Sequence, residues 1–127
     1  MDRKIIHTPK APKAVGTYNQ AVVSGNFVFT SGQIAIDPGT GKLIEGSFSD
    51  RVDQILKNLN AILVAAGSDL TKSIRLTVFL TDLKNFSELN EVFLKRFEGM
   101  DPPARSTVEV CALPLGTDVE IDCVAGI

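Results

Sequence analysis

The spacing of apolar residues predicts two helices in this chain. Residues 49–66 carry an apolar residue at every third or fourth position, as in a helix that buries one stripe. We expect Ser49 to cap the start of this helix and Gly67 to end it. The same spacing over residues 86–98 predicts a second helix, whose inner face would carry Phe86, Leu89, Phe93 and Phe97.

Alternating apolar and polar residues predict strands around these helices. Residues 21–34 form two strand-like runs joined by a tight turn at 24–26, and the Pro and Gly content of 37–42 predicts a further turn. Three more strands are expected at 73–82, 105–112 and 119–125. The order is hairpin, helix, strand, helix, strand, strand, which predicts an α+β fold with the helices on one face of a sheet.

The sheet face that the helices leave uncovered mixes charged and apolar side chains. Alternation along the strands puts on this face Arg75, Thr77, Phe79, Arg105, Thr107, Glu109, Glu120 and Asp122. A face that is wholly in water seldom keeps a phenylalanine in mid-strand. We therefore infer that another subunit buries part of this face.

Composition and charge fit one soluble domain over residues 1–127. Apolar residues make up 44% of the chain, charged residues make up 22%, and the formal net charge is −2. Since there is no basic run, a nucleic-acid partner is not expected. The N-terminal segment lacks the apolar core of a signal peptide and no stretch is long enough to span a membrane, so we expect a cytoplasmic protein without a membrane partner.

The residue content argues against several common catalytic arrangements. His7 is the single histidine, which argues against a catalytic triad, and without a CxxC motif or a histidine cluster no metal site is expected. The GTGK run at 39–42 lacks the full spacing of a phosphate-binding loop. Cys111 and Cys123 fall in apolar strand-like runs, so we expect buried, reduced thiols, with a disulfide or a reactive thiol as the alternatives.

Two charged residues in apolar surroundings are candidates for chemistry. Arg105 opens a strand after two prolines, and a guanidinium can bind a carboxylate through two parallel hydrogen bonds. The alternative role of Arg105 is a salt bridge at the surface or between subunits. Glu120 alternates with Val119 and Ile121, so it faces away from the core and is either a general base or a solvated carboxylate.

Three uncharged residues are weaker candidates for the same site. Asn90 lies close to the apolar stripe of the second helix, where a buried amide needs hydrogen-bond partners in a loop or in a site. Tyr18 is the only tyrosine, and packing in the core or at an edge is the alternative to a site role. Gly32 stands where a strand ends, which suggests that another group approaches its backbone closely.

Four segments, which together cover nearly the whole chain, resemble one known family. The segments VGTYNQA, VFTSGQI, TVFLTDLKNFSELNEVF and PPARSTVEVCALPLGTDVEID are similar to the RidA (YjgF-type) reactive-intermediate deaminases. The resemblance implies a chorismate-mutase-like fold with a mixed sheet of about six strands. It also implies a homotrimer around a central barrel, with a ligand cleft at each subunit interface. The implied reaction is hydrolysis of enamines and imines to 2-keto acids and ammonia, without a cofactor.

The resemblance also assigns roles to residues of this chain. Arg105 matches the arginine that binds the substrate carboxylate, and Glu120 matches the acidic residue that positions or activates water. The remaining cleft residues that the resemblance implies are Tyr18, Asn90, Ser31, Gly32 and Thr107. Thr107 replaces a cysteine that many members carry, which argues against thiol chemistry. Thr17 replaces the proline that usually precedes the tyrosine, which loosens that loop.

The resulting hypothesis is a 2-iminobutanoate/2-iminopropanoate deaminase that acts on 2-aminoacrylate and related intermediates, with a small 2-imino or 2-keto acid as its ligand. One alternative is a non-enzymatic protein that binds small carboxylates or acts as a regulator or chaperone. Another alternative is a ribonuclease that inhibits translation. The net charge of −2 gives the ribonuclease little support.

Overall fold

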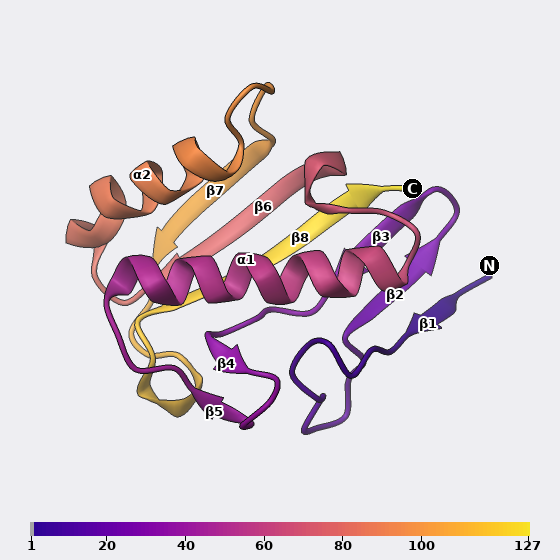
Figure 1. Cartoon of the computed structure of the whole chain (residues 1–127), viewed down its shortest axis with the longest axis horizontal. Helices are drawn as coiled ribbons and strands as arrows, with labels where there is room; N and C mark the ends of the chain where they lie inside the picture. Colours follow the sequence, from indigo (N-terminus) through magenta and orange to yellow (C-terminus); the bar gives the residue numbers. More distant parts are fainter. Residues whose placement is uncertain (1) are drawn as a thin grey trace.

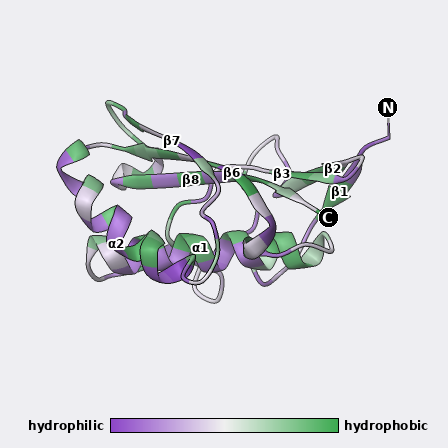
Figure 2. Ribbon diagram, turned by 90° about the horizontal axis from the view of Figure 1, so that it is seen from above, coloured by the Kyte–Doolittle hydropathy of each residue, from purple (hydrophilic) through white to green (hydrophobic). Residues whose placement is uncertain are grey.

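Two helices lie on the same face of a six-stranded sheet in the computed structural model, which describes residues 2–127 (Figure 1). The helices are α1 (Phe48–Ala65) and α2 (Phe86–Arg96). In Figure 2 the strands form one layer and the helices form the other. This arrangement confirms the predicted α+β fold with two helices on one face of a mixed sheet.

The strand order across the sheet is β1-β2-β3-β8-β6-β7. In that order the strands span Lys4–Ile6, Ala21–Ser24, Phe27–Thr30, Val119–Gly126, Ser73–Leu80 and Ala104–Glu109. Neighbouring strands are antiparallel except β6 and β7, which run parallel because α2 connects them. A separate hairpin of β4 (Ile36–Asp37) and β5 (Lys42–Leu43) surrounds the predicted turn. Short 3₁₀ turns occur at Leu70–Lys72, Leu83–Asn85 and Pro114–Gly116.

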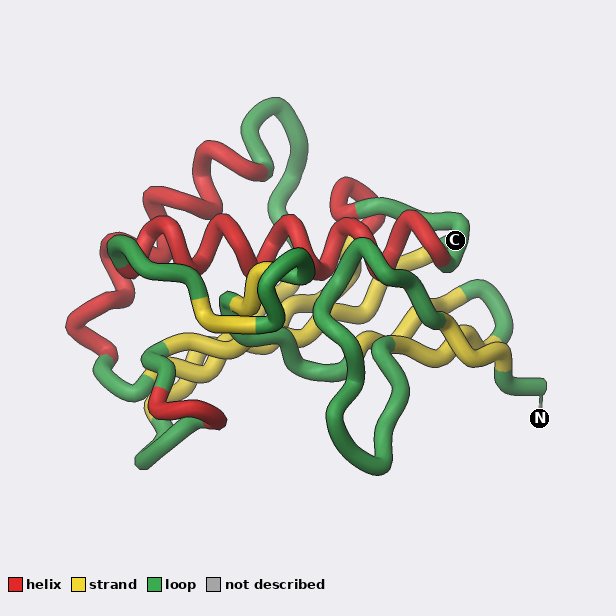
Figure 3. Tube along the Cα trace, turned by 60° about the horizontal axis from the view of Figure 1, so that its bottom comes forward, coloured by secondary structure: helices red, strands yellow, loops and turns green. Residues whose placement is uncertain are grey.

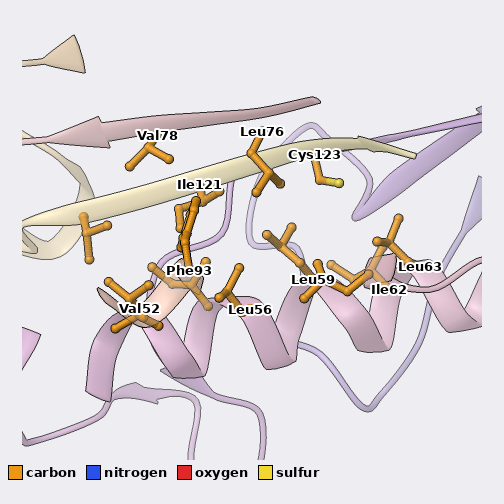
Figure 4. Packing of buried hydrophobic residues seen from close by; sticks show 14 of the residues in the cluster. Val52, Leu56, Leu59, Ile62, Leu63, Leu76, Val78, Phe93, Ile121 and Cys123 are labelled. Carbon is orange, nitrogen blue, oxygen red and sulfur yellow. The ribbon is translucent and has the colours of Figure 1, made fainter. Parts of the chain in front are cut away.

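The buried stripe of α1 packs against the covered face of the central strands (Figure 4). The labelled side chains are Val52, Leu56, Leu59, Ile62 and Leu63 of α1, Leu76 and Val78 of β6, Phe93 of α2, and Ile121 and Cys123 of β8. Each large apolar side chain that is fully buried contributes about 1.5–3 kcal/mol to folding. The core therefore fixes α1 across β6 and β8 and leaves β7, at the edge, to α2.

The cap at the start of α1 differs from the prediction. Ser47, rather than Ser49, is the N-cap: its hydroxyl accepts a hydrogen bond from the N–H of Asp50, whose carboxylate accepts one from the N–H of Ser47 (both 3.1 Å). This reciprocal pair is a capping box. Ser49 lies inside the helix and donates its hydroxyl to Glu88 of α2 (2.8 Å). Gly67 adopts a φ of +85° just after the helix, as expected for the residue that ends it.

The predicted uncovered face is confirmed for β6 and β8 and is wrong for β7. The parallel register pairs Arg105 with Leu76 and Thr107 with Val78, both of which are buried residues of β6. Paired residues point to the same face of a sheet, so Arg105 and Thr107 lie on the side of the helices. Val108, which is 42% exposed, occupies the uncovered face instead.

Glu109 was also predicted on the uncovered face, but it pairs with Leu80 on the helix side. Its carboxylate accepts a hydrogen bond from the N–H of Leu83 (3.0 Å). The physical reason for the error is the position of β7 at the sheet edge. Only α2 covers this strand, so its inner side is incompletely sealed and can carry polar side chains.

The two cysteines differ in environment. Cys123 is buried in β8, as predicted, and burial raises the pKa of its thiol to about 11. Cys111 was also predicted to be buried but is exposed, because β7 ends at Glu109 and Cys111 lies in the loop beyond it. Both thiols are free.

The described part of the chain has no helix that is long and apolar enough to cross a membrane.

Candidate functional site

Arg105 lies between two aromatic rings of α2. Its guanidinium carbon is 5.3 Å from the ring centroid of Phe86 and 5.3 Å from that of Phe93. Both distances are within the range of a cation–π interaction. Within residues 2–127 the one ion pair shorter than 4.0 Å is Arg51–Asp118, so no carboxylate neutralises Arg105. Partial burial lowers the pKa of Arg105, which is the effect of desolvation without a compensating negative charge.

A groove of about 840 Å³ opens beside Arg105, between α2, the loop that follows it and β7. Its polar groups come from Asn90 and Arg105 and from the charged Lys95 and Glu98. Its apolar surface comes from Leu76, Phe93, Leu94, Phe97, Met100, Pro102 and Pro103. The predicted candidates Asn90 and Arg105 therefore come together. A mostly apolar groove with a few convergent polar groups is typical of a small-molecule site.

Thr107 carries a polar atom that the described chain leaves unsatisfied. Its Oγ1 is buried and has no hydrogen-bond partner among residues 2–127. Leaving such a group unpaired costs about 1–3 kcal/mol, so buried hydroxyls almost always have a partner. Thr107 points to the same side of β7 as Arg105, so the unpaired hydroxyl and the guanidinium both lie on the helix side of this strand.

Glu120 lies on the uncovered face of the sheet, paired with Phe79 of β6. Its carboxylate packs against Gly32: a Cβ added to that glycine would lie 2.7 Å from Glu120 Oε2, which is too close for any real side chain. The close backbone approach predicted at Gly32 is therefore made by this carboxylate. Burial raises the pKa of Glu120, and the charge of Asp122 raises it further.

The segment before β2 is attached to the end of β3 through Ser31. The N–H of Ser31 donates to the carbonyl of Gln20 (2.9 Å), and its hydroxyl donates to the carbonyl of Asn19 (2.5 Å). The long loop between β1 and β2 projects from the sheet in Figure 3. The buried side chain of Gln20 holds this loop, because its Oε1 accepts a hydrogen bond from the N–H of Thr8 (2.7 Å). Tyr18 lies next to these anchors and is 47% exposed, so core packing does not explain it.

The predicted site residues thus form two groups. The first group (Arg105, Thr107 and Asn90) lies on the helix side of the sheet, at β7 and α2. The second group (Glu120, Gly32, Ser31 and Tyr18) lies at β8, the end of β3 and the loop before β2. The side chains of Arg105 and Glu120 point to opposite faces of the sheet, and β6 separates their strands. One copy of the chain does not bring them together.

Sequence reasoning missed the two rings beside Arg105. Phe86 was predicted to point into the core, but it is 40% exposed and contacts the guanidinium. The available signal was the spacing: Phe86 and Phe93 are seven residues apart, which is two helical turns on one face. One loop joins this helix to β7, which carries Arg105, so the helix and the strand are consecutive elements of the chain.

Histidine and cysteine are not part of either group. His7 is exposed between β1 and the long loop, and Cys123 belongs to the core. Across the described part of the chain, no three His, Cys, Asp or Glu side chains are placed to hold a metal ion. The chemistry that both groups offer is that of a guanidinium, a hydroxyl, an amide and a carboxylate.

Comparison with known proteins gives matches over almost the whole chain. Residues 8–127 match the family model described as endoribonuclease L-PSP. The 2-iminobutanoate/2-iminopropanoate deaminase of Rattus norvegicus is 44% identical over 123 residues, which cover 97% of this chain and 89% of the rat protein. At this identity and coverage the similarity extends through both groups of site residues.

Solved structures agree with the sequence matches. The conserved Rid-family protein YyfA from Yersinia pestis superimposes with a TM-score of 0.96 at 42% identity, covering 99% of this chain and 100% of that protein. E. coli TdcF, solved with bound serine, superimposes with a TM-score of 0.92 at 42% identity and covers 98% of each chain. The bound serine shows that TdcF accepts a small molecule with a carboxylate and an amine.

Proposed function

Since the chain belongs to the endoribonuclease L-PSP family, also called the YjgF/RidA family, we propose that it hydrolyses 2-imino acids and their enamine tautomers. The products would be a 2-keto acid and ammonia, and 2-iminobutanoate and 2-iminopropanoate are the proposed substrates. The rat, human and mouse relatives, each named 2-iminobutanoate/2-iminopropanoate deaminase, support the proposal. The observation that carries it is a half-buried guanidinium, at the wall of a groove, that no carboxylate of the described chain neutralises.

Arg105 would bind the substrate carboxylate. A guanidinium matches a carboxylate through two parallel hydrogen bonds, which fix the orientation of the ligand as well as its charge. The buried Thr107 hydroxyl, on the same side of β7, would bond the nitrogen of the substrate and thereby gain the partner that it lacks. Both interactions select a short molecule with a carboxylate next to a nitrogen-bearing carbon.

We propose that a second copy of the chain completes the site. Glu120 cannot reach a ligand bound at Arg105 of the same copy, because their side chains leave opposite faces of the sheet. The uncovered face also exposes apolar side chains that a neighbouring copy would bury, including Phe27 (46% exposed) and Phe29 (47% exposed). A homotrimer with a cleft at each interface accounts for both observations.

The proposed reaction needs a base for water. Glu120 takes a proton from water as the oxygen bonds to the imine carbon, the electrons of the C=N bond move to nitrogen, and Glu120 passes that proton to the nitrogen to give a carbinolamine. Glu120 then takes the proton of the new hydroxyl and delivers it to the nitrogen as the C–N bond breaks, so that ammonia leaves and the carbonyl of the keto acid forms. Burial and Asp122 raise the pKa of Glu120, which makes its carboxylate a better base than one in water.

The test generates the imine in place with a pyridoxal-phosphate threonine dehydratase and follows the release of 2-ketobutanoate. We expect the native protein to accelerate release, and Arg105→Lys and Glu120→Gln to lose most of that acceleration, since an ammonium does not replace a guanidinium fork. Arg96→Lys is the control, because Arg96 is exposed at the end of α2. Native rates in Arg105→Lys would show that the assignment is wrong.

RNA cleavage is the second candidate, because the matching family model is described as an endoribonuclease. The test incubates single-stranded RNA with nuclease-free preparations of the native protein and of the Arg105→Lys variant. We expect no cleavage that depends on Arg105, since the formal net charge of −2 gives no general attraction for a polyanion. Cleavage that disappears in the variant would favour the ribonuclease over the deaminase.

A further inference from the structure

We propose that Phe86 and Phe93 are positioning residues that hold the Arg105 guanidinium between their rings in place of a protein carboxylate. This inference rests on the proposed function and deepens it. The rings occupy the position where an acidic partner would otherwise lie, so the hydrogen-bonding edge of the guanidinium remains free for the carboxylate of the substrate.

The distances support a position between the rings. Seven residues of an α-helix rise by about 10.5 Å. The guanidinium carbon lies 5.3 Å from both ring centroids, which belong to residues seven positions apart on one helix face, so it contacts both rings at once. Aromatic faces attract a cation but accept no strong hydrogen bond. The two rings, which we call the clamp, stabilise the charge of Arg105 and leave its N–H donors available.

Arg51 shows what the alternative looks like in the same molecule. Its Nε and Nη2 donate to the two carboxylate oxygens of Asp118 (2.8 and 2.7 Å), and its Nη1 donates to the carbonyl of Gly46 (2.8 Å). These bonds use three of the five N–H donors of Arg51, and both oxygens of Asp118 neutralise its charge, so this guanidinium is committed to the fold. Arg105 has aromatic neighbours instead, and we attribute its availability to that difference.

The two rings are suited to different tests. Phe93 is buried and packs edge-to-face against Phe97 (5.9 Å between centroids), so replacing it also disturbs the core. Phe86 is 40% exposed at the start of α2, so Phe86→Leu removes a ring with little effect on folding. Phe86→Tyr keeps the ring and serves as the conservative variant.

The experiment measures KM and kcat for 2-iminobutanoate and the dissociation constant of 2-ketobutanoate. For Phe86→Leu we expect KM and the dissociation constant to rise about three- to tenfold with kcat little changed, and for Phe86→Tyr values within about twofold of native. Leu83→Ala is the control, an exposed apolar residue in the turn before α2 that lies outside the groove. It should behave as native.

A second readout does not depend on catalysis. Ring currents of the clamp should move the Nε–Hε resonance of Arg105 away from its usual NMR position in the ligand-free protein, and Phe86→Leu should move it back. An unchanged resonance together with native KM and ligand affinity in Phe86→Leu would overturn the clamp and leave the deaminase proposal intact. If the native protein binds 2-ketobutanoate without hydrolysing the imine, the deaminase proposal fails, and the change in dissociation constant still decides the clamp.

Discussion

Two regions of the molecule are built around an arginine and differ in how that arginine is satisfied. In the paired corner (Arg51, Asp118 and Gly46), the guanidinium donates three hydrogen bonds, and the bond to Asp118 is the first cause of its raised pKa. In the unpaired edge (Arg105 and Thr107), burial lowers the pKa of the arginine and the hydroxyl has no partner within residues 2–127. Unsatisfied polar groups cost stability, so a fold that keeps them reserves them for a ligand or a partner chain.

The largest expected effects come from exchanging the two arginines for glutamine, one at a time. Arg105→Gln should lower kcat/KM for imine hydrolysis by about 100-fold or more, because it removes a charged bidentate contact, and should leave the melting temperature unchanged or higher. Arg51→Gln should keep activity and lower the free energy of unfolding by about 1 kcal/mol, the size expected for an ion pair that is partly in contact with solvent. Steady-state kinetics and thermal unfolding of both variants give the answer.

The contrast between the two arginines is wrong if both substitutions change activity and stability in the same way. Equal losses of activity in Arg51→Gln and Arg105→Gln would mean that the corner also contributes to the site. A large loss of stability in Arg105→Gln would mean that the clamped guanidinium holds the fold rather than a substrate.

The next largest effect is expected at Gly32, which extends the comparison to the second group of site residues. Gly32→Ala would place a methyl group 2.7 Å from Glu120 Oε2 and displace the carboxylate, so kcat should fall by about 10- to 100-fold. Gly39→Ala is the matched control, because its methyl group would meet only the side chain of Asp37, at 3.3 Å, in the β4–β5 turn. Equal rates for both variants would show that the placement of Glu120 is unimportant.

A smaller effect, with opposite signs for stability and activity, is expected at Thr107. Thr107→Val keeps the shape and removes the unsatisfied hydroxyl, so unfolding should cost about 1 kcal/mol more while kcat/KM falls by about tenfold. Thr107→Ser, which keeps the hydroxyl, should stay close to native activity. If Thr107→Val lowers stability instead, the hydroxyl has a structural partner and is not held free for a ligand.

The smallest effect is a shift in pH dependence through Asp122. The pKa of Glu120 is raised first by burial and then by the charge of Asp122, so Asp122→Asn should lower it. Because the base form of Glu120 then persists to lower pH, the acidic limb of the kcat/KM profile should move to lower pH, with the plateau nearly unchanged. A limb that stays in place would assign that ionisation to a group other than Glu120.

Much of the fold could be predicted from the sequence because its helices and central strands have strong periodicity. The buried stripe of α1 and the buried faces of β6 and β8 follow directly from apolar spacing. The short strand β1 could not be found in this way, since Lys4–Ile6 is held by pairing with β2 rather than by its own pattern. The cap of α1 had a usable signal, because Ser47 and Asp50 have the spacing of a capping box and Ser49 has no such partner.

Arg105 and Thr107 were predicted on the uncovered face of the sheet and lie on the helix side instead. Both sets of alternate side chains in β7 mix polar and apolar residues, so only its pairing with β6 reveals that Arg105 faces the helices. The contact between Gly32 and Glu120 joins residues 88 positions apart, which no local pattern can show. The placement of Arg105 and Glu120 on opposite faces is a property of the assembled sheet and has no signature in a linear sequence.

The placement of Arg105 and Glu120 on opposite faces makes defects at these two residues complementary. Consider a cyclic assembly in which Arg105→Gln and Glu120→Gln chains are mixed in equal amounts. A cleft is intact when its Arg105 comes from a Glu120→Gln chain and its Glu120 comes from an Arg105→Gln chain. Random assortment gives this combination in about one half times one half, or about a quarter, of the clefts. Two preparations that are each inactive should therefore recover about a quarter of native activity after being dissociated and reassembled together, and either one alone should recover none.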